Sequence, residues 1–181
     1  MIVRAALGTL CLAALPALAS AQTGTLSNTD KAFLKSTAEM DMTEAHLGEM
    51  ARDQASNDAV KNLGQTLVDN HTKDYQHLTA LAEKTGASIP KGIDIRRDRG
   101  IETLMKEKGG AFDRHFVNDV VQQHRRALDE YQREASRGEN ADLKAYAQSM
   151  VPTVQEHLDK AVALQKSAGG TGSGSAERSK R

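Results

Sequence analysis

The sequence predicts an all-α fold, a bundle of four long amphipathic helices. In four segments, apolar side chains recur every three or four residues, as they do along one face of an α-helix. Glycine, proline and short polar residues fall between these segments, where the chain has to turn. No part of the sequence alternates apolar and polar residues for long enough to indicate a β-strand.

The first two predicted helices, residues 28–55 and 58–84, form a hairpin. Asn28 or Thr29 can cap the first, and a short Ser-Asn-Asp turn precedes the second. Gly86 ends the second helix, because glycine readily adopts the left-handed conformation found there. The inward faces consist of Phe33, Thr37, Met40, Glu44, Leu47 and Ala51 in the first helix, and of Val60, Gly64, Leu67, His71, Asp74, Leu78 and Leu81 in the second.

Residues 112–136 and 141–167 form the second predicted hairpin. Pro152 lies inside the fourth helix and is expected to bend it or to open one backbone hydrogen bond. Asp113 is expected to cap the third helix. The inward faces consist of Asp113, Val117, Val120, His124, Ala127, Leu128 and Tyr131 in the third helix, and of Leu143, Ala147, Met150, Val154, His157, Ala161 and Leu164 in the fourth.

The connection between the two hairpins is long. It contains Pro90, Gly92 and Gly100 as helix breakers and a short predicted helix over residues 101–108. At about 25 residues it exceeds the usual loop between neighbouring helices. The sequence therefore predicts a crossover along the bundle, as in ferritin-like folds, rather than a simple up-down-up-down arrangement.

Residues 1–21 are predicted to be a cleavable signal peptide. Arg4 precedes an apolar stretch, and small residues follow it, so cleavage is expected after Ala21. The apolar stretch is too short for a lasting membrane span. Cys11, the single cysteine, lies inside this segment, and the large Leu10 before it argues against a lipid anchor. The mature chain is thus expected to be exported and to fold without disulfides.

The composition excludes several classes of partner. Lys and Arg total 24, as do Asp and Glu, with both signs interspersed, and there is no Trp. We therefore expect no nucleic-acid partner and no membrane insertion, since neither a basic patch nor aromatic stacking platforms are present. Residues 22–167 should form one domain, and the Gly/Ser-rich charged tail at 168–181 is predicted to be disordered. The sequence leaves open a protein partner and the oligomeric state.

Each inward face carries one residue that can bind a metal or a proton: Glu44, His71, His124 and His157. Counted from the turn of each hairpin, the two residues of a pair differ by three positions, about 4.5 Å of helix rise. The four side chains should therefore meet in one layer inside the bundle. Buried alone, each would cost a few kcal/mol, roughly, whereas together they can satisfy one another or hold an ion.

Two interpretations of this layer remain open. Three imidazoles and one carboxylate suit one divalent transition-metal ion, which can be Zn, Fe, Cu or Mn. Asp74 and Tyr75, about one turn beyond His71, can then orient a ligand. Alternatively, the layer only fixes the register of the helices, and the outer faces bind a protein partner. Metal handling or a role in envelope stress is favoured over catalysis, and an oxidase or peroxidase using the same ion is the least favoured class.

Several short segments resemble a bacterial family of exported ferritin-like bundles, catalogued as a domain of unknown function and often labelled outer-membrane proteins. The segments are EAHLG at 44–48, LVDNHTKD at 67–74, GGAFDRHF at 109–116, QQH at 122–124 and VPTVQEHL at 151–158. The resemblance covers residues 30–164 and implies a ferritin-like fold, a periplasmic location and no established enzymatic activity. The sequence offers no anchor to support the outer-membrane label.

This sequence differs from the resembled family and from di-iron bundles at positions that bear on metal binding. The family usually has Asp directly before the histidine of the second helix, where this chain has Asn70. Any orienting role of that carboxylate would then pass to Asp69 or Asp74. Di-iron bundles also use Glu-x-x-His pairs, but Val68 and Val154 stand three residues before the two histidines. A single nitrogen-rich metal ion is therefore expected instead of a di-iron centre.

Overall fold

The computed structural model describes residues 26–93 and 99–170. They form five helices and no strand: α1 Asn28–Gln54, α2 Asp58–Thr85, α3 Arg99–Leu104, α4 Gly109–Arg137 and α5 Ala141–Gly170. No helix in this part of the chain has the length and hydropathy of a membrane span. The predicted signal peptide, and the tail beyond residue 170, lie outside the described residues.

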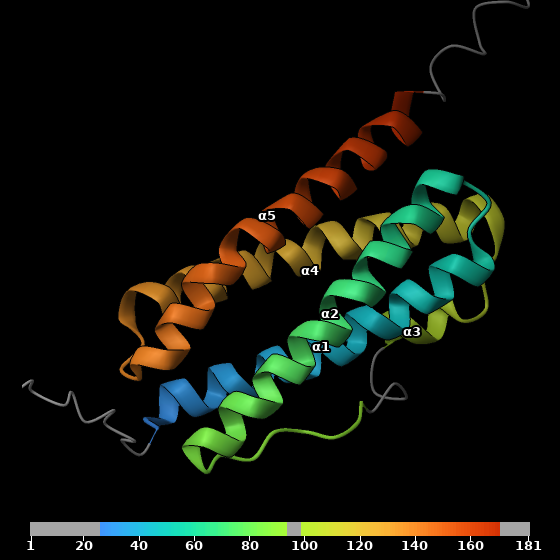
Figure 1. The fold of residues 1–181 in the computed structure, drawn as a ribbon. Helices are drawn as coiled ribbons and strands as arrows, with labels where there is room; N and C mark the ends of the chain where they lie inside the picture. Colours follow the sequence, from blue (N-terminus) through green and yellow to red (C-terminus); the bar gives the residue numbers. More distant parts are fainter. Residues whose placement is uncertain (1–25, 94–98, 171–181) are drawn as a thin grey trace, which may run out of the picture.

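The four long helices form a ferritin-like bundle (Figure 1), as predicted. α1 pairs with α2 and α4 with α5, while α1 also packs on α4 and α2 on α5. Ser56, after the end of α1, bonds to Asp113 at the start of α4. Lys84, at the end of α2, forms an ion pair with Asp142 at the start of α5. All neighbouring helices are therefore antiparallel, so the connection from α2 to α4 must run the length of the bundle.

The first helix is capped one residue earlier than predicted. Ser27 is the N-cap: its hydroxyl accepts from the backbone N–H of Asp30 over 3.1 Å, and the Asp30 carboxylate accepts from the N–H of Ser27 over 3.2 Å. The expectation that Asn28 or Thr29 caps α1 is therefore wrong, because this reciprocal pair satisfies two free backbone donors at once. The other helix bounds agree with the predicted ones to within about one turn.

This cap yields a stability prediction. Ser27→Ala is expected to lower the free energy of unfolding by about 1 kcal/mol, because the N–H of Asp30 loses its acceptor. Urea denaturation measures the change. Ser149→Ala is the control, since that hydroxyl bonds only to the carbonyl of Tyr146 in its own helix. Equal effects of the two substitutions would contradict the assignment of the cap.

Asp113 joins the two hairpins rather than capping its own helix. The N-cap of α4 is Lys108, without a side-chain hydrogen bond, so the expected capping role of Asp113 is wrong. Its carboxylate accepts from the backbone N–H and the hydroxyl of Ser56 and from the N–H of Asn57. These donors are exposed at the turn between α1 and α2, and the three bonds fix that turn on α4.

At mid-height a polar layer divides the core into two apolar clusters. One cluster lies toward the turn between α1 and α2 and includes Leu47, Leu67 and Phe116. The other lies toward the turn between α4 and α5 and includes Phe33 and Leu143. The helices pass from one cluster to the other at buried polar residues: Asp41 and Glu44 in α1, His71 and Asp74 in α2, His124 in α4 and His157 in α5. The common height inferred from the sequence is thus confirmed.

Two glycines let α1 and α2 approach closely beside this layer. A Cβ atom on Gly48 would lie 2.5 Å from the carbonyl oxygen of Gly64, and one on Gly64 would lie 2.7 Å from that of Gly48. Neither position can take a side chain without moving backbone. The close contact of the two helices therefore fixes how Glu44 and His71, roughly one or two turns away, face the other hairpin.

Candidate metal centre

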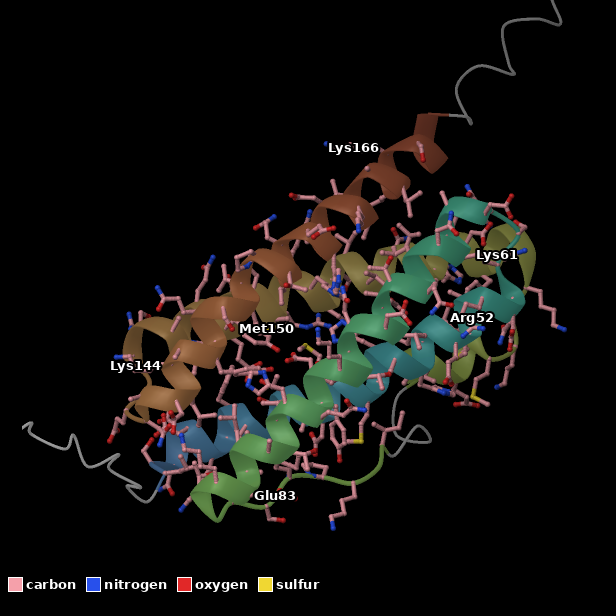
Figure 2. The ribbon with its side chains drawn as sticks, in the orientation of Figure 1. Arg52, Lys61, Glu83, Lys144, Met150 and Lys166 are labelled. Atoms are coloured by element: carbon pink, nitrogen blue, oxygen red, sulfur yellow. The ribbon has the colours of Figure 1, made fainter. Side chains whose placement is uncertain are left out.

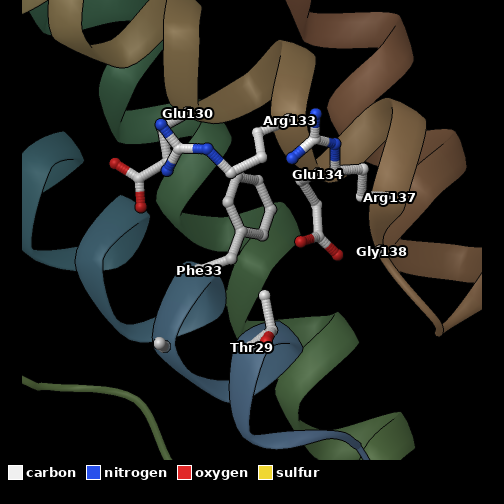
Figure 3. A pocket seen from close by; sticks show the side chains of 8 residues that line it. Thr29, Phe33, Glu130, Arg133, Glu134, Arg137 and Gly138 are labelled. Carbon is white, nitrogen blue, oxygen red and sulfur yellow. The ribbon is translucent and has the colours of Figure 1, made fainter.

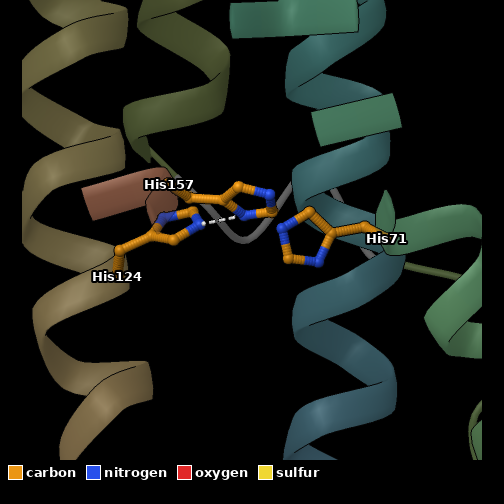
Figure 4. A group of neighbouring side chains, drawn as sticks. All are labelled: His71, His124 and His157. Atoms are coloured by element: carbon orange, nitrogen blue, oxygen red, sulfur yellow. Dashed lines mark hydrogen bonds between the residues drawn. The ribbon is translucent and has the colours of Figure 1, made fainter. Parts of the chain in front are cut away.

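Three buried histidines from three helices face one another in the polar layer (Figure 4). His71 comes from α2, His124 from α4 and His157 from α5. One ring nitrogen of each lies within 4.8 Å of those of the other two. The ring centroid of His71 lies 5.7 Å from that of His124 and 5.4 Å from that of His157, and the last two are 5.3 Å apart. The expectation that these histidines meet inside the bundle is confirmed.

Hydrogen bonds join two of the histidines into a chain with one direction. The carbonyl of Val120 can only accept, so Nδ1 of His124 carries the proton of their 3.1 Å bond. In a neutral ring, Nε2 of His124 is then an acceptor, and it receives the Nδ1–H of His157 over 3.2 Å. Nε2 of His157 in turn accepts from the side-chain amide of Asn70 over 2.8 Å. The chain therefore runs from Asn70 to Val120.

The surroundings keep all three rings neutral. Burial and the charge of His157 together lower the pKa of His124 to about 4, against the opposing effect of the Val120 carbonyl. Burial also lowers the pKa of His157 to about 4, together with the charge of Lys160. The pKa of His71 is held well below its usual value by burial and by the other two rings. At pH 7 each ring thus has one lone pair, as a metal ligand requires.

His71 has the least satisfied ring of the three. Its Nδ1 lies 2.9 Å from Oδ1 of Asp41, a fully buried carboxyl of α1. Its Nε2 is buried and has no hydrogen-bond partner among the described residues. Burial raises the pKa of Asp41, as do the charges of Asp74 and Glu44. An ion at Nε2 would require Nδ1 to donate to Asp41 in its carboxylate form, so that Nε2 keeps its lone pair, the arrangement usual for histidines that bind a metal.

Glu44 lies in the layer but outside the group of three nitrogens. Its Oε1 is 3.7 Å from Nδ1 of His124, the nitrogen already bonded to Val120. Both carboxyl oxygens are buried and lack a hydrogen-bond partner in the described part of the chain. Burial and the charge of Asp119 together raise the pKa of Glu44 to about 8, against the opposing charge of Arg126. At neutral pH Glu44 is therefore protonated.

Asp74 and Tyr75 contact other parts of the bundle. The carboxylate of Asp74 accepts from the hydroxyls of Tyr131 and Tyr146, over 3.2 and 2.7 Å. Asp74, Tyr131 and Tyr146 thus form a separate hydrogen-bonded group beside the histidines. The hydroxyl of Tyr75 donates to the carbonyl of Pro90 over 2.7 Å. Tyr75 thus anchors the crossover to α2, and no hydrogen bond joins either predicted residue to a histidine of the group.

A surface cavity lies at the end of the bundle where α1 begins and α4 ends. It has a volume of about 370 Å³, and Figure 3 shows the carboxyl group of Glu134 directed into it beside the ring of Phe33. Burial and the hydrogen bond with Asp30 raise the pKa of Glu134 to about 7. Its lining includes no histidine. Among the described residues, the three histidines remain the group suited to a metal ion.

The family described as Domain of unknown function (DUF4142) matches residues 15–164. The chain belongs to this family. No curated protein matches the DUF4142 chain in sequence. The family description assigns no activity, so any function has to be argued from the site itself.

Two solved structures share the fold of this DUF4142 protein. One is described as "putative secreted protein DUF305" from Streptomyces coelicolor; it is 12% identical with a TM-score of 0.68, covering 78% of this chain and 92% of its own. The other is a DUF305 fragment from Deinococcus radiodurans, 10% identical with a TM-score of 0.68, covering 81% of this chain and 99% of its own. At these identities the likeness concerns the helical fold.

The sequence analysis did not single out Asp41 as a partner of the site. It placed Met40 on the inward face, whereas Met40 is half-buried and Asp41 has no exposure. The spacing held a signal for it: Asp41 stands three residues before Glu44, so both lie on one side of the helix. It assigned no contact to Asn70 either, which bonds to His157. Residue type and period alone do not predict which ring a half-buried amide reaches.

Proposed function

We propose that this DUF4142 domain binds one divalent transition-metal ion between His71, His124 and His157, and that it serves metal handling in the periplasm rather than catalysis. The observation that carries the proposal is the Nε2 atom of His71. It is buried and lacks a hydrogen-bond partner among the described residues, and His71 is one of the three histidines whose ring nitrogens come within 4.8 Å of one another. Leaving such an atom unsatisfied costs roughly 1–3 kcal/mol, which an ion would offset.

The other two rings offer matching donors. Nε2 of His124 and Nδ1 of His157 lie 3.2 Å apart. Two nitrogens at 2.0–2.1 Å from a tetrahedral zinc ion are separated by about 3.3 Å, so this pair already has a suitable spacing. Asp41 and the Val120 carbonyl bond to the opposite nitrogens of His71 and His124. Such outer partners orient the ligands of metal sites.

The fourth position falls to Glu44 or to water. Glu44 is the carboxyl that lies 3.7 Å from Nδ1 of His124, and a divalent charge nearby would favour its ionised form. Three imidazole nitrogens with at most one carboxylate suit zinc, copper or iron better than magnesium or calcium, which prefer oxygen. Glu44→Gln separates the two arrangements, since it should weaken binding only if the carboxylate is a ligand.

Export to the periplasm is the second part of the proposal. The N-terminal sequence has the pattern of a signal peptide, and a structural neighbour is described as secreted. A metal site built without cysteine is suited to an oxidising compartment, because imidazole does not form disulfides.

A rival function, a structural module whose polar layer only fixes helix register, is favoured by one observation. The hydrogen-bond chain from Asn70 to Val120 satisfies two of the histidines without an ion. On that view His71 alone is left unsatisfied, and partner binding would depend on the outer helix faces.

Metal analysis of protein isolated from the periplasm without chelator tests the proposal. We expect about one ion per chain, and a melting midpoint that falls when EDTA removes it, because an ion that binds only the folded state stabilises it. His71→Ala should abolish both, whereas His115→Ala should not, since His115 is exposed on α4 and contacts Glu107. Absence of an ion together with a melt unaffected by EDTA and by added zinc would refute the metal site.

A further inference from the structure

In the hydrogen-bonded state, the lone pair of His157 is on Nε2, beside Asn70, and not on Nδ1, which faces His124. Nε2 of His124 is occupied as the acceptor from His157, and Nδ1 of His157 carries the proton of that bond. Only Nε2 of His71 lacks a partner. An ion held between Nε2 of His124 and Nδ1 of His157, the pair whose 3.2 Å separation suits a zinc site, therefore requires the proton of His157 to leave Nδ1.

The ring of His157 can meet this requirement and remain neutral. The proton is lost from Nδ1 and one is gained at Nε2, so the charge of the ring is unchanged. Nε2 then becomes a donor and needs an acceptor, but at present the NH2 group of Asn70 faces it. Reversal of the Asn70 amide presents Oδ1 in place of the NH2 group, and the same 2.8 Å contact then holds the other tautomer.

Asn70 is placed to reverse without opening the core. It is half-buried and lines a surface cavity of about 500 Å³ between α2 and α5. Asp74, Gln76 and Met150 also line this cavity, and Met150 is labelled midway along α5 in Figure 2. One side of the amide thus meets solvent and the other meets His157, deep in the layer.

We propose that the side-chain amide of Asn70 selects which nitrogen of His157 carries the proton, and so determines whether the histidines form a closed hydrogen-bond chain or a three-nitrogen metal site. Asn70 is a positioning residue, because it acts through His157. The proposal rests on the proposed function, since it explains how the same rings serve with and without an ion. It also predicts that the affinity for the metal ion depends on a residue that is not itself a ligand, as in other metal sites where an outer partner orients a histidine.

Asn70→Asp tests the proposal, because a carboxylate can only accept and therefore favours the proton on Nε2 of His157. Nitrogen-15 NMR of metal-free protein at pH 7.5 reads the tautomer directly. We expect Nδ1–H in the wild type and Nε2–H in N70D. Competition with a chromophoric chelator should show that N70D binds zinc at least about tenfold more tightly than the wild type.

Gln76→Glu is the matched control. It adds the same charge to the same cavity from an exposed position, where water and salt screen it. We expect this variant to keep the wild-type tautomer and to bind zinc within about a factor of three of the wild type. A thermal melt of each variant confirms that it is folded.

The outcomes separate the two proposals. If the wild type binds zinc but the tautomer is the same in N70D, the role of Asn70 is refuted and the metal site stands. If the tautomer changes while zinc affinity matches that of Q76E, the role of Asn70 is refuted as well. If neither the wild type nor N70D binds zinc, the metal site itself is refuted, and the role of Asn70 with it.

Discussion

Replacing His124 and His157 together by leucine is expected to raise the free energy of unfolding of the metal-free protein by about 1–4 kcal/mol and to abolish its response to zinc. Both rings are almost fully buried, and each is held neutral by its surroundings. Leucine has a similar volume and needs no hydrogen bond, so it should join the two apolar clusters on either side of the layer. Buried polar groups replaced in this way often yield a more stable fold.

The double substitution leaves few polar groups unsatisfied. The Val120 carbonyl keeps its place in the backbone of α4, and the Asn70 amide can turn to the solvent of its cavity. Neither loss should offset the apolar gain. Removing His71 instead would strand the buried carboxyl of Asp41, which is why His71 stays in this variant.

Urea denaturation in EDTA, and then with zinc, measures both effects. His115→Leu serves as the control for adding leucine in place of an exposed histidine of α4. A gain in stability with loss of the zinc response would show that the layer is maintained at a cost for the sake of the ion. A loss of stability in EDTA would instead favour the structural role, because the hydrogen-bond chain would then be holding the bundle in register.

The position of the polar layer could be predicted because it depends only on the helical period and on the number of residues between each polar side chain and the turn of its hairpin. A 3.6-residue period identifies Glu44, His71, His124 and His157 as inward-facing, and counting residues from two short turns places them at one height. The turns themselves carry clear signals, such as Gly86, which adopts φ 66° at the end of α2. The length of the segment between α2 and α4 predicted the ferritin-like connectivity, because the chain has to return along the bundle before α4 can begin.

What the period does not predict is the direction of each side chain within the layer. Glu44 points to the Nδ1 side of His124, whereas Asp41, one turn earlier, reaches His71. Both contacts join residues of different helices, so they depend on tertiary packing rather than on the spacing within α1. The hydroxyl of Tyr75 likewise finds Pro90 in the crossover, a partner that no helical spacing relates to it.

Glu44 should make the stability of the protein fall as the pH rises from 6.5 to 8.5. Burial raises its pKa from the ordinary 4.5 to about 8, so in this range the folded state holds a proton that the unfolded state has released. Its contribution is complete below pH 4.5 and is lost as the pH rises through 8. Each such proton changes the free energy of unfolding by about 1.4 kcal/mol per pH unit, which gives a loss of about 2 kcal/mol.

Glu44→Gln isolates this effect, because glutamine has nearly the same shape and does not titrate. Urea denaturation in EDTA at pH 6.5 and 8.5 should show the wild type losing about 2 kcal/mol more than E44Q. The three histidines have lowered pKa values, so their contribution is lost as the pH falls below about 6.5; it is common to the wild type and E44Q and cancels in the difference. Glu83→Gln, an exposed site on α2, controls for the change of residue type. Parallel losses in the wild type and E44Q would mean that Glu44 is already ionised at neutral pH, and a carboxylate ligand beside the three rings would then be available without any proton release.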